Sequence, residues 1–90
     1  MVSILYGKKY RKNLQELIIE IPTIGSNVDQ RVKWFRNNPP DTRLRNHSLH
    51  KKLEGKWAFS VTGDIRIIYK WVGTNTVRLL TIGRHKMVYR

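Results

Sequence analysis

The fold of this chain is easiest to infer from residues 57–71, whose sequence is WAFSVTGDIRIIYKW. Large apolar side chains alternate with small ones from residue 57 to 61, and this two-residue period is typical of a half-buried β-strand. Thr62-Gly63-Asp64 has the composition of a tight turn, and residues 65–71 form a second run of apolar and aromatic side chains. The segment therefore predicts two antiparallel strands joined by a short turn.

The sequence on either side of this hairpin predicts further strands and a helix. Residues 73–75 indicate another turn, residues 76–82 a further strand, and the short apolar run at 2–5 a first strand. Apolar side chains recur at intervals of three and four from Tyr10 to Ile21, as on one face of a helix. Pro22 should end this helix because proline lacks a backbone N–H.

A second helix is predicted after Pro22. Ser26 with Asp29 three positions later resembles a capping box and marks the expected start, and Asn37-Asn38-Pro39-Pro40 marks the end. The order strand–helix–helix–three strands predicts one α+β domain over residues 1–90. In it, two N-terminal helices pack on a twisted antiparallel sheet of about four strands.

The composition points to a polyanionic partner. Eighteen basic and six acidic residues give a formal net charge of +12, which favours binding to nucleic acid, an anionic surface or an acidic protein. The alternative is a charged coat that only keeps the protein soluble. The chain has no cysteine, which excludes disulfides, thiolate chemistry and cysteine-type zinc sites. We expect a cytoplasmic protein, because no apolar run is long enough to span a membrane and no signal peptide is recognisable.

The half of the chain from residue 43 to residue 90 carries chemistry as well as charge. It holds eleven Lys/Arg and all three histidines against two acids, Glu54 and Asp64. Histidine is the side chain best placed to exchange protons near neutral pH, and the arginine fork matches a phosphate. A basic face with these residues suits phosphodiester chemistry on RNA.

Asp64 and Arg66 are one candidate pair. Alternate residues of a strand point to the same face, so a strand that begins by Asp64 would project both together. The carboxylate could orient the guanidinium or accept a proton, and the guanidinium could bind a phosphate. Taken alone, the pattern favours an ordinary turn aspartate and a surface arginine.

The histidines and Tyr89 are the other candidates. His47 and His50 lie in a basic loop at 43–56, where their spacing could also suit a metal ion, although no third ligand is nearby. His85 follows the last predicted strand, and Tyr89 comes four positions later. The Tyr89 ring offers a stacking surface for an unpaired base. It could equally anchor the C-terminal segment in the core.

Several short motifs in series carry a family resemblance. They are LRNHSL at 44–49, LEGKW at 53–57, GDIRIIY at 63–69 and GRH at 83–85, followed by Tyr89. This series resembles the RelE/ParE superfamily of bacterial toxins, and within it the YafQ and YoeB branches of type II toxin–antitoxin systems. The resemblance covers nearly the whole chain, and the predicted order of elements fits the fold of that superfamily.

The resemblance implies a function and a set of roles. It implies an endoribonuclease that needs no cofactor, cuts mRNA on the small ribosomal subunit, and is neutralised by an acidic cognate antitoxin. By position, His47 matches the family's loop histidine, Asp64 its acidic turn residue, His85 its C-terminal histidine and Tyr89 a C-terminal aromatic residue. Arg66 matches the arginine of the YoeB-like branch.

The chain also departs from both branches. Ser60 stands where YafQ-like toxins carry a further histidine, and Arg43 falls near a glutamate of YoeB-like toxins. We therefore leave the general base open between His47 and Asp64. Arg66 is the expected phosphate clamp, His85 the expected acid, and Tyr89 the expected base-stacking residue. The residues expected to bind RNA are Arg43, Arg45, His50, Lys51, Lys52, Lys56, Arg84, Lys86 and Arg90.

Two other functions remain open at this point. A ParE-like protein of the same fold would inhibit DNA gyrase without catalysis, and its basic face would meet protein or DNA. A simple RNA-binding module would need none of the histidines. The set of histidine, aspartate and arginine residues favours the ribonuclease, because a pure binder has no chemical use for it.

Overall fold

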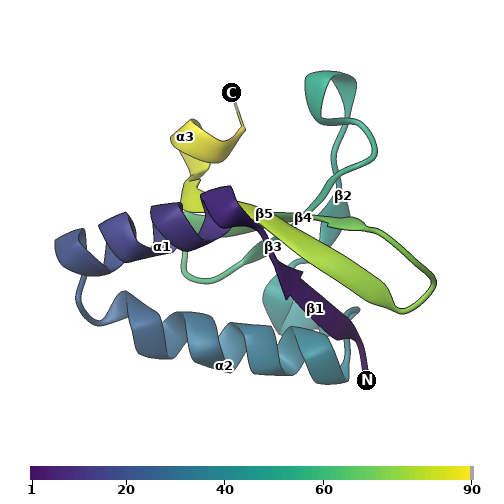
Figure 1. Ribbon diagram of the computed structural model, residues 1–90, viewed down its shortest axis with the longest axis horizontal. Helices are drawn as coiled ribbons and strands as arrows, with labels where there is room; N and C mark the ends of the chain where they lie inside the picture. Colours follow the sequence, from purple (N-terminus) through teal and green to yellow (C-terminus); the bar gives the residue numbers. More distant parts are fainter. Residues whose placement is uncertain (90) are drawn as a thin grey trace.

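The computed structural model of this protein describes residues 1–89. Strands, helices and two short 3₁₀ helices follow one another along the chain (Figure 1). In order, they are β1 (Ser3–Tyr6), α1 (Lys8–Glu20), α2 (Ile24–Asn37), η1 (Thr42–Leu44), β2 (His47–Ser48), η2 (Lys51–Leu53), β3 (Trp57–Ser60), β4 (Ile65–Trp71), β5 (Thr76–Arg84) and α3 (His85–Val88).

The strands form one five-stranded sheet in the order β1-β5-β4-β3-β2. The predicted α+β class and the two N-terminal helices are confirmed, but the four-stranded antiparallel sheet was wrong in two respects. β1 pairs parallel to β5, with Ser3 opposite Thr76, because the chain crosses back through α1 and α2 before the sheet continues. The short β2 adds a fifth strand from within the basic loop, where two residues are too few to show a period.

The start of α2 also differs from the prediction. The helix begins at Ile24 with Thr23 as its N-cap, and Ser26 lies inside the first turn, where its hydroxyl donates to the Thr23 carbonyl at 3.1 Å. Ile24 is buried, so the packing of its side chain starts the helix two residues earlier in the sequence than the predicted cap, Ser26. The predicted end of α1 before Pro22 is confirmed.

The main core lies between the sheet and the two long helices. Phe35 of α2 stacks on Phe59 of β3 with ring centroids 4.7 Å apart, and its ring meets Tyr69 of β4 edge-on at 4.8 Å. All three side chains are fully buried. Burying one such aromatic side chain stabilises a fold by about 1.5–3 kcal/mol, so this cluster holds α2 against the middle of the sheet.

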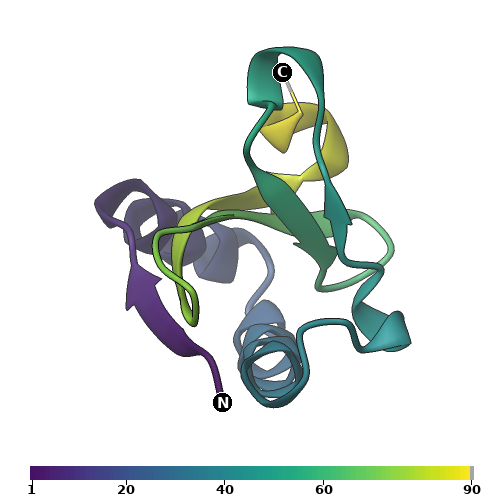
Figure 2. The ribbon, with the colours of Figure 1, turned by 90° about the vertical axis from the view of Figure 1, so that its right-hand side faces the viewer.

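The other face of the sheet is covered as well, which the sequence did not predict. The strand predicted at residues 57–61 was expected to be half-buried. That expectation was wrong, because Ala58 is 0% exposed and Ser60 9% exposed. α3 packs on β4 and β5 over this second face. Figures 1 and 2 show that α3 and the turn carrying η2 project from the same side of the sheet, away from α2. Among residues 1–89, no helix has the length and apolar character needed to cross a membrane.

Candidate functional site

Three rings from two distant parts of the chain meet on the second face of the sheet. His47 stands on β2, paired with Ala58 of β3, whereas His85 begins α3 and Tyr89 follows it. The Tyr89 ring lies 6.5 Å from the His47 ring and 4.4 Å from the His85 ring, measured between centroids. Tyr89 therefore sits between two histidines that lie far apart in the sequence.

The His47 ring has a defined orientation. Its Nδ1 lies 2.8 Å from the carbonyl oxygen of Arg45. A carbonyl only accepts, so this hydrogen bond needs a proton on Nδ1 and leaves the Nε2 lone pair of the neutral ring available to bind another proton. Arg45 holds this carbonyl in place with a left-handed backbone, φ 51°, a conformation that costs a residue with a side chain about 1–2 kcal/mol.

Tyr89 and Arg66 are neighbours in this site. The Tyr89 hydroxyl is buried and has no hydrogen bond of standard geometry to any of the residues 1–89. Burial raises the pKa of Tyr89 above its ordinary value, and the charge of Arg66 partly opposes that rise.

Arg66 is set between two small residues. It lies on β4 opposite Ser60 of β3 and Gly83 of β5, and its Nη1 donates to the carbonyls of Thr62 at 2.8 Å and Gly63 at 3.0 Å. These bonds tie the guanidinium to the β3–β4 turn. The arginine is thereby oriented before any ligand binds, which is what a phosphate clamp requires.

Asp64 does not form the predicted pair with Arg66. Its carboxylate accepts from Arg84 at 3.1 Å, and Arg84 also pairs with Glu20 of α1. The hydrogen bond from Arg84 is the largest of the causes that hold the pKa of the Asp64 carboxyl below its ordinary value. The Asp64 carbonyl accepts from the His85 amide at 2.8 Å. Asp64 thus remains ionised and fixes the start of α3.

A cleft of about 210 Å³ opens beside this site at the β3–β4 turn. Four arginines from three separate segments line it together with Ser60, Val61, Thr62 and Gly63: Arg31 of α2, Arg43 and Arg45 of the loop after it, and Arg66 of β4. We call it the arginine cleft. Arg31 was missed in the sequence, because nothing in the local pattern of α2 connects it with residues 43–45.

The other predicted RNA-binding residues are spread more widely. His50, Lys51 and Lys52 lie exposed around η2, at the tip of the projecting turn, and Lys86 is exposed on α3. Lys56 and Arg84 line a second hollow between α1 and α3. Arg90 lies outside the described residues. Within residues 1–89, no three His, Asp or Glu side chains cluster closely enough to hold a metal ion.

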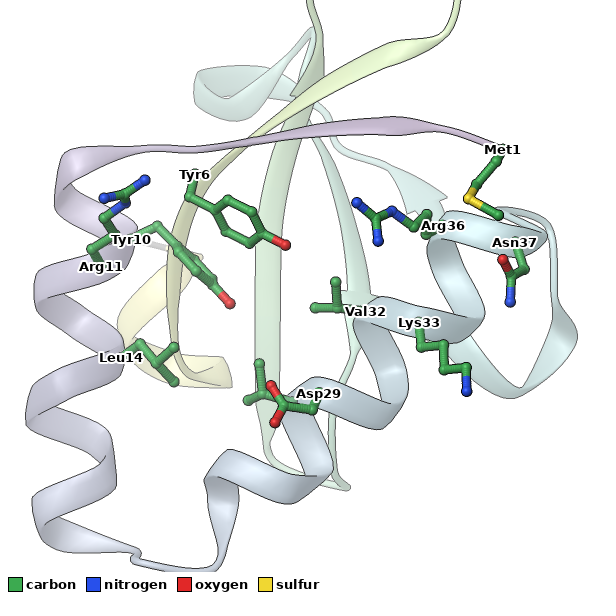
Figure 3. A pocket seen from close by; sticks show the side chains of 11 residues that line it. Met1, Tyr6, Tyr10, Arg11, Leu14, Asp29, Val32, Lys33, Arg36 and Asn37 are labelled. Carbon is green, nitrogen blue, oxygen red and sulfur yellow. The ribbon is translucent and has the colours of Figure 1, made fainter.

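A further hollow lies away from all of these residues. It is a groove of about 640 Å³ between α1 and α2. Figure 3 shows the rings of Tyr6 and Tyr10 directed into it toward Val32 of α2. Within residues 1–89, its lining contains none of the predicted site residues.

Comparison with solved structures reveals the same fold in bacterial toxins. YafQ from E. coli strain BL21(DE3) superposes with a TM-score of 0.81 at 18% identity, covering 100% of both chains. A YoeB/ParE toxin from Agrobacterium tumefaciens gives 0.77 at 11% identity, covering 92% of this chain and 98% of that one. A chain of the E. coli DinJ–YafQ toxin–antitoxin complex gives 0.78 at 20% identity, covering 99% and 98%. No family model and no curated protein matches the sequence. The fold expected from the family resemblance is thereby confirmed.

Proposed function

We propose that this chain is the toxin of a type II toxin–antitoxin pair and acts as an endoribonuclease that cuts mRNA on the ribosome without a metal ion. The observation that carries the proposal is the row of rings from His47 through Tyr89 to His85, with Arg66 beside Tyr89. These residues supply two proton carriers and a fixed positive charge on one face. The fold shared with known toxins supports the same conclusion.

The reaction is an internal displacement at phosphorus. The RNA 2′-oxygen attacks the adjacent phosphorus as it loses its proton to a base, and the bond from phosphorus to the 5′-oxygen breaks as that oxygen receives a proton from an acid. The products are a 2′,3′-cyclic phosphate and a free 5′-hydroxyl. Each proton transfer by a positioned side chain contributes roughly 10²–10⁴-fold to the rate.

His47 is the better candidate for the base. The hydrogen bond from its Nδ1 to the Arg45 carbonyl leaves Nε2 free to accept the 2′-hydroxyl proton. Asp64, the other candidate, is engaged by Arg84 and has a lowered pKa, so it is a weak proton acceptor. We assign to Asp64 the role of positioning His85, which acts as the acid.

Arg66 acts on the phosphate, and Tyr89 acts on the phosphate and on a nucleobase. The Arg66 guanidinium, held by the carbonyls of Thr62 and Gly63, would stabilise the charge that grows on the phosphate oxygens. By analogy with oxyanion holes, one such donor contributes about 2.7–4 kcal/mol. The Tyr89 hydroxyl gains the hydrogen-bond partner it lacks when RNA is bound, and its ring supports an unpaired base.

An acidic antitoxin is the expected protein partner. The net charge of +12 repels other copies of the chain and attracts a polyanionic or acidic surface. The E. coli YafQ with the same fold was solved in complex with DinJ as a toxin–antitoxin pair. An acidic partner that covers the face carrying His47, His85 and Tyr89, or the arginine cleft, would block the binding of RNA.

The test is cleavage of an mRNA in EDTA, with and without programmed ribosomes, by the wild-type chain and by His85→Ala. We expect cuts ending in a 2′,3′-cyclic phosphate, slowed about 10²–10⁴-fold in the variant. Equal binding of a 2′-O-methyl RNA, which cannot react, is the control that the variant still folds and binds.

Two results would contradict the proposal. Unchanged cleavage by His85→Ala would remove that residue from the mechanism. A folded wild-type chain that makes no cuts under either condition would exclude the ribonuclease, and a DNA supercoiling assay with gyrase would then test the ParE-like alternative.

A further inference from the structure

The arginine cleft holds more positive charge than the neighbouring acid can balance. Arg31, Arg43, Arg45 and Arg66 line it, and among residues 1–89 no carboxylate lines it. The acid bonded to one of these arginines is Asp41, which accepts from Arg43 at 3.0 Å and 2.7 Å. Guanidinium groups gathered in a hollow repel one another, so an anion bound among the remaining three would reduce this repulsion.

Two of the guanidinium groups are held on one indole ring. Arg43 lies 3.6 Å and Arg31 4.4 Å from the centroid of the Trp34 ring. A cation over an indole face is stabilised by about 0.5–1 kcal/mol at an exposed site, and the two bonds to Asp41 fix Arg43 further. The charges are therefore oriented before a ligand arrives, which lowers the entropy lost on binding.

The same contacts indicate what the cleft recognises. Guanidinium groups stacked on the Trp34 ring compete with a nucleobase for its faces, whereas their N–H groups can still donate to phosphate oxygens. Phosphate contacts position a nucleic acid without reading its sequence. The cleft is thus suited to the backbone of an RNA rather than to a particular base.

The cleft is connected to the histidine site through two residues. Arg45 lines the cleft while its carbonyl holds His47. Arg66 lines the cleft and lies close enough to Tyr89 for its charge to oppose part of the rise that burial causes in the pKa of Tyr89. An RNA strand whose reacting phosphate lies among His47, His85 and Arg66 would therefore place a neighbouring phosphate at or near the cleft.

We propose that the arginine cleft binds a backbone phosphate of single-stranded RNA next to the phosphate that is cleaved, with Arg31 as a binding residue. The identity of the RNA as substrate rests on the proposed function. Arg31 touches no reacting atom and acts on affinity, whereas His47 and His85 act on the chemical step.

The experiment measures binding of a fluorescent 2′-O-methyl RNA by anisotropy over a series of salt concentrations. Arg31→Ala should weaken binding about tenfold, as expected for loss of a hydrogen bond to a charged group. Affinity falls with salt, and the slope of log affinity against log salt should become less steep by about 0.7, the value for one phosphate contact on a single strand. Arg36→Ala is the matched control, because it removes the same charge from an exposed site on α2 outside the cleft.

Three outcomes would overturn this proposal. The first is an unchanged slope for Arg31→Ala, and the second is an equal loss in Arg31→Ala and Arg36→Ala, which would show a general effect of charge. The third is inorganic phosphate that competes with the RNA at equal concentration, which would make the cleft a site for free anions.

Cleavage of unmodified RNA separates this inference from the proposed function. At limiting RNA concentration, Arg31→Ala should cut about tenfold more slowly than the wild-type chain, in proportion to its loss of affinity. A wild-type chain that binds the RNA through Arg31 but never cuts it contradicts the ribonuclease and leaves the cleft assignment intact. A chain that cuts RNA but binds it equally well without Arg31 contradicts the cleft alone.

Discussion

The two faces of the sheet are both covered, but they are built differently. Against α1 and α2, β3 and β4 present large side chains such as Phe59 and Tyr69, which pack ring to ring on Phe35. Toward α3, β3 presents Ala58 and Ser60, β4 presents Arg66, and β5 contributes Gly83. The first face maximises buried apolar area, whereas the second leaves room for functional side chains.

The histidine site and the adjoining arginine cleft carry features that reduce stability. The Tyr89 hydroxyl is buried without a standard hydrogen bond, Arg45 adopts a left-handed backbone, and four arginines share one cleft. Such features persist only where the rest of the structure determines them. The comparison teaches that the core face stabilises the fold strongly enough for the opposite face to be arranged for binding and chemistry.

Truncating one side chain on each face should show the largest difference in stability between the two faces. We expect Phe59→Ala to lower the free energy of unfolding by about 3–5 kcal/mol, because it leaves a cavity beside Phe35 and Tyr69. His47→Ala, on the exposed side chain of the other face, should change it by less than about 0.5 kcal/mol. Urea unfolding followed by tryptophan fluorescence measures both. Similar losses in the two variants would show that the faces do not divide their tasks.

High pH should act on the core face through Tyr69. Burial raises the pKa of Tyr69 from 10.0 to about 12. The folded protein therefore holds this proton more tightly than the unfolded chain does, so its stabilising effect is complete below pH 10 and is lost as the pH rises toward 12. The expected loss is about 1.4 kcal/mol per pH unit.

Tyr69→Phe is the control for this titration. It removes the hydroxyl that donates to Asn46 at 2.6 Å, so it should be less stable at neutral pH and lose stability less steeply between pH 10 and 12. Denaturant unfolding at several pH values tests this. Parallel curves for both proteins would mean that Tyr69 does not titrate in this range. Tyr10, whose pKa is also raised by burial, contributes equally to both curves.

The substitution Gly83→Ala, which adds a single methyl group, should lower activity more than stability. A Cβ at this position would lie 3.2 Å from Val88 Cγ1, so α3 must move by a few tenths of an ångström. We expect stability within about 1 kcal/mol of wild type, since lower flexibility of the unfolded chain offsets part of the strain. Cleavage should fall about tenfold, because α3 positions His85 and Tyr89.

Gly73→Ala is the matched control, because it adds the same methyl group in the β4–β5 turn at an ordinary contact distance of 3.8 Å from Thr76. Single-turnover cleavage and thermal unfolding of both variants measure the two effects. Equal cleavage by Gly83→Ala and Gly73→Ala would show that the placement of α3 does not limit the reaction.

Much of this architecture follows from local patterns in the sequence. The alternation in residues 57–61 and the turn at 62–64 predicted the central hairpin, Pro22 predicted the end of α1, and the spacing of apolar residues predicted α1 itself. These signals are readable because helix and strand periods act over a few neighbouring residues. Residue types alone also indicated His47, His85 and Arg66 as candidates, since proton transfer and phosphate binding require such side chains.

Only the tertiary structure decided how distant segments meet. The parallel pairing of β1 with β5, the bond of Asp64 to Arg84 rather than Arg66 and the entry of Arg31 into the cleft each join segments far apart in the chain. The burial of Ala58 and Ser60 depends likewise on α3 closing over the second face. No local period encodes such contacts, because they depend on how helices and strands pack, and that packing is determined by the whole chain at once.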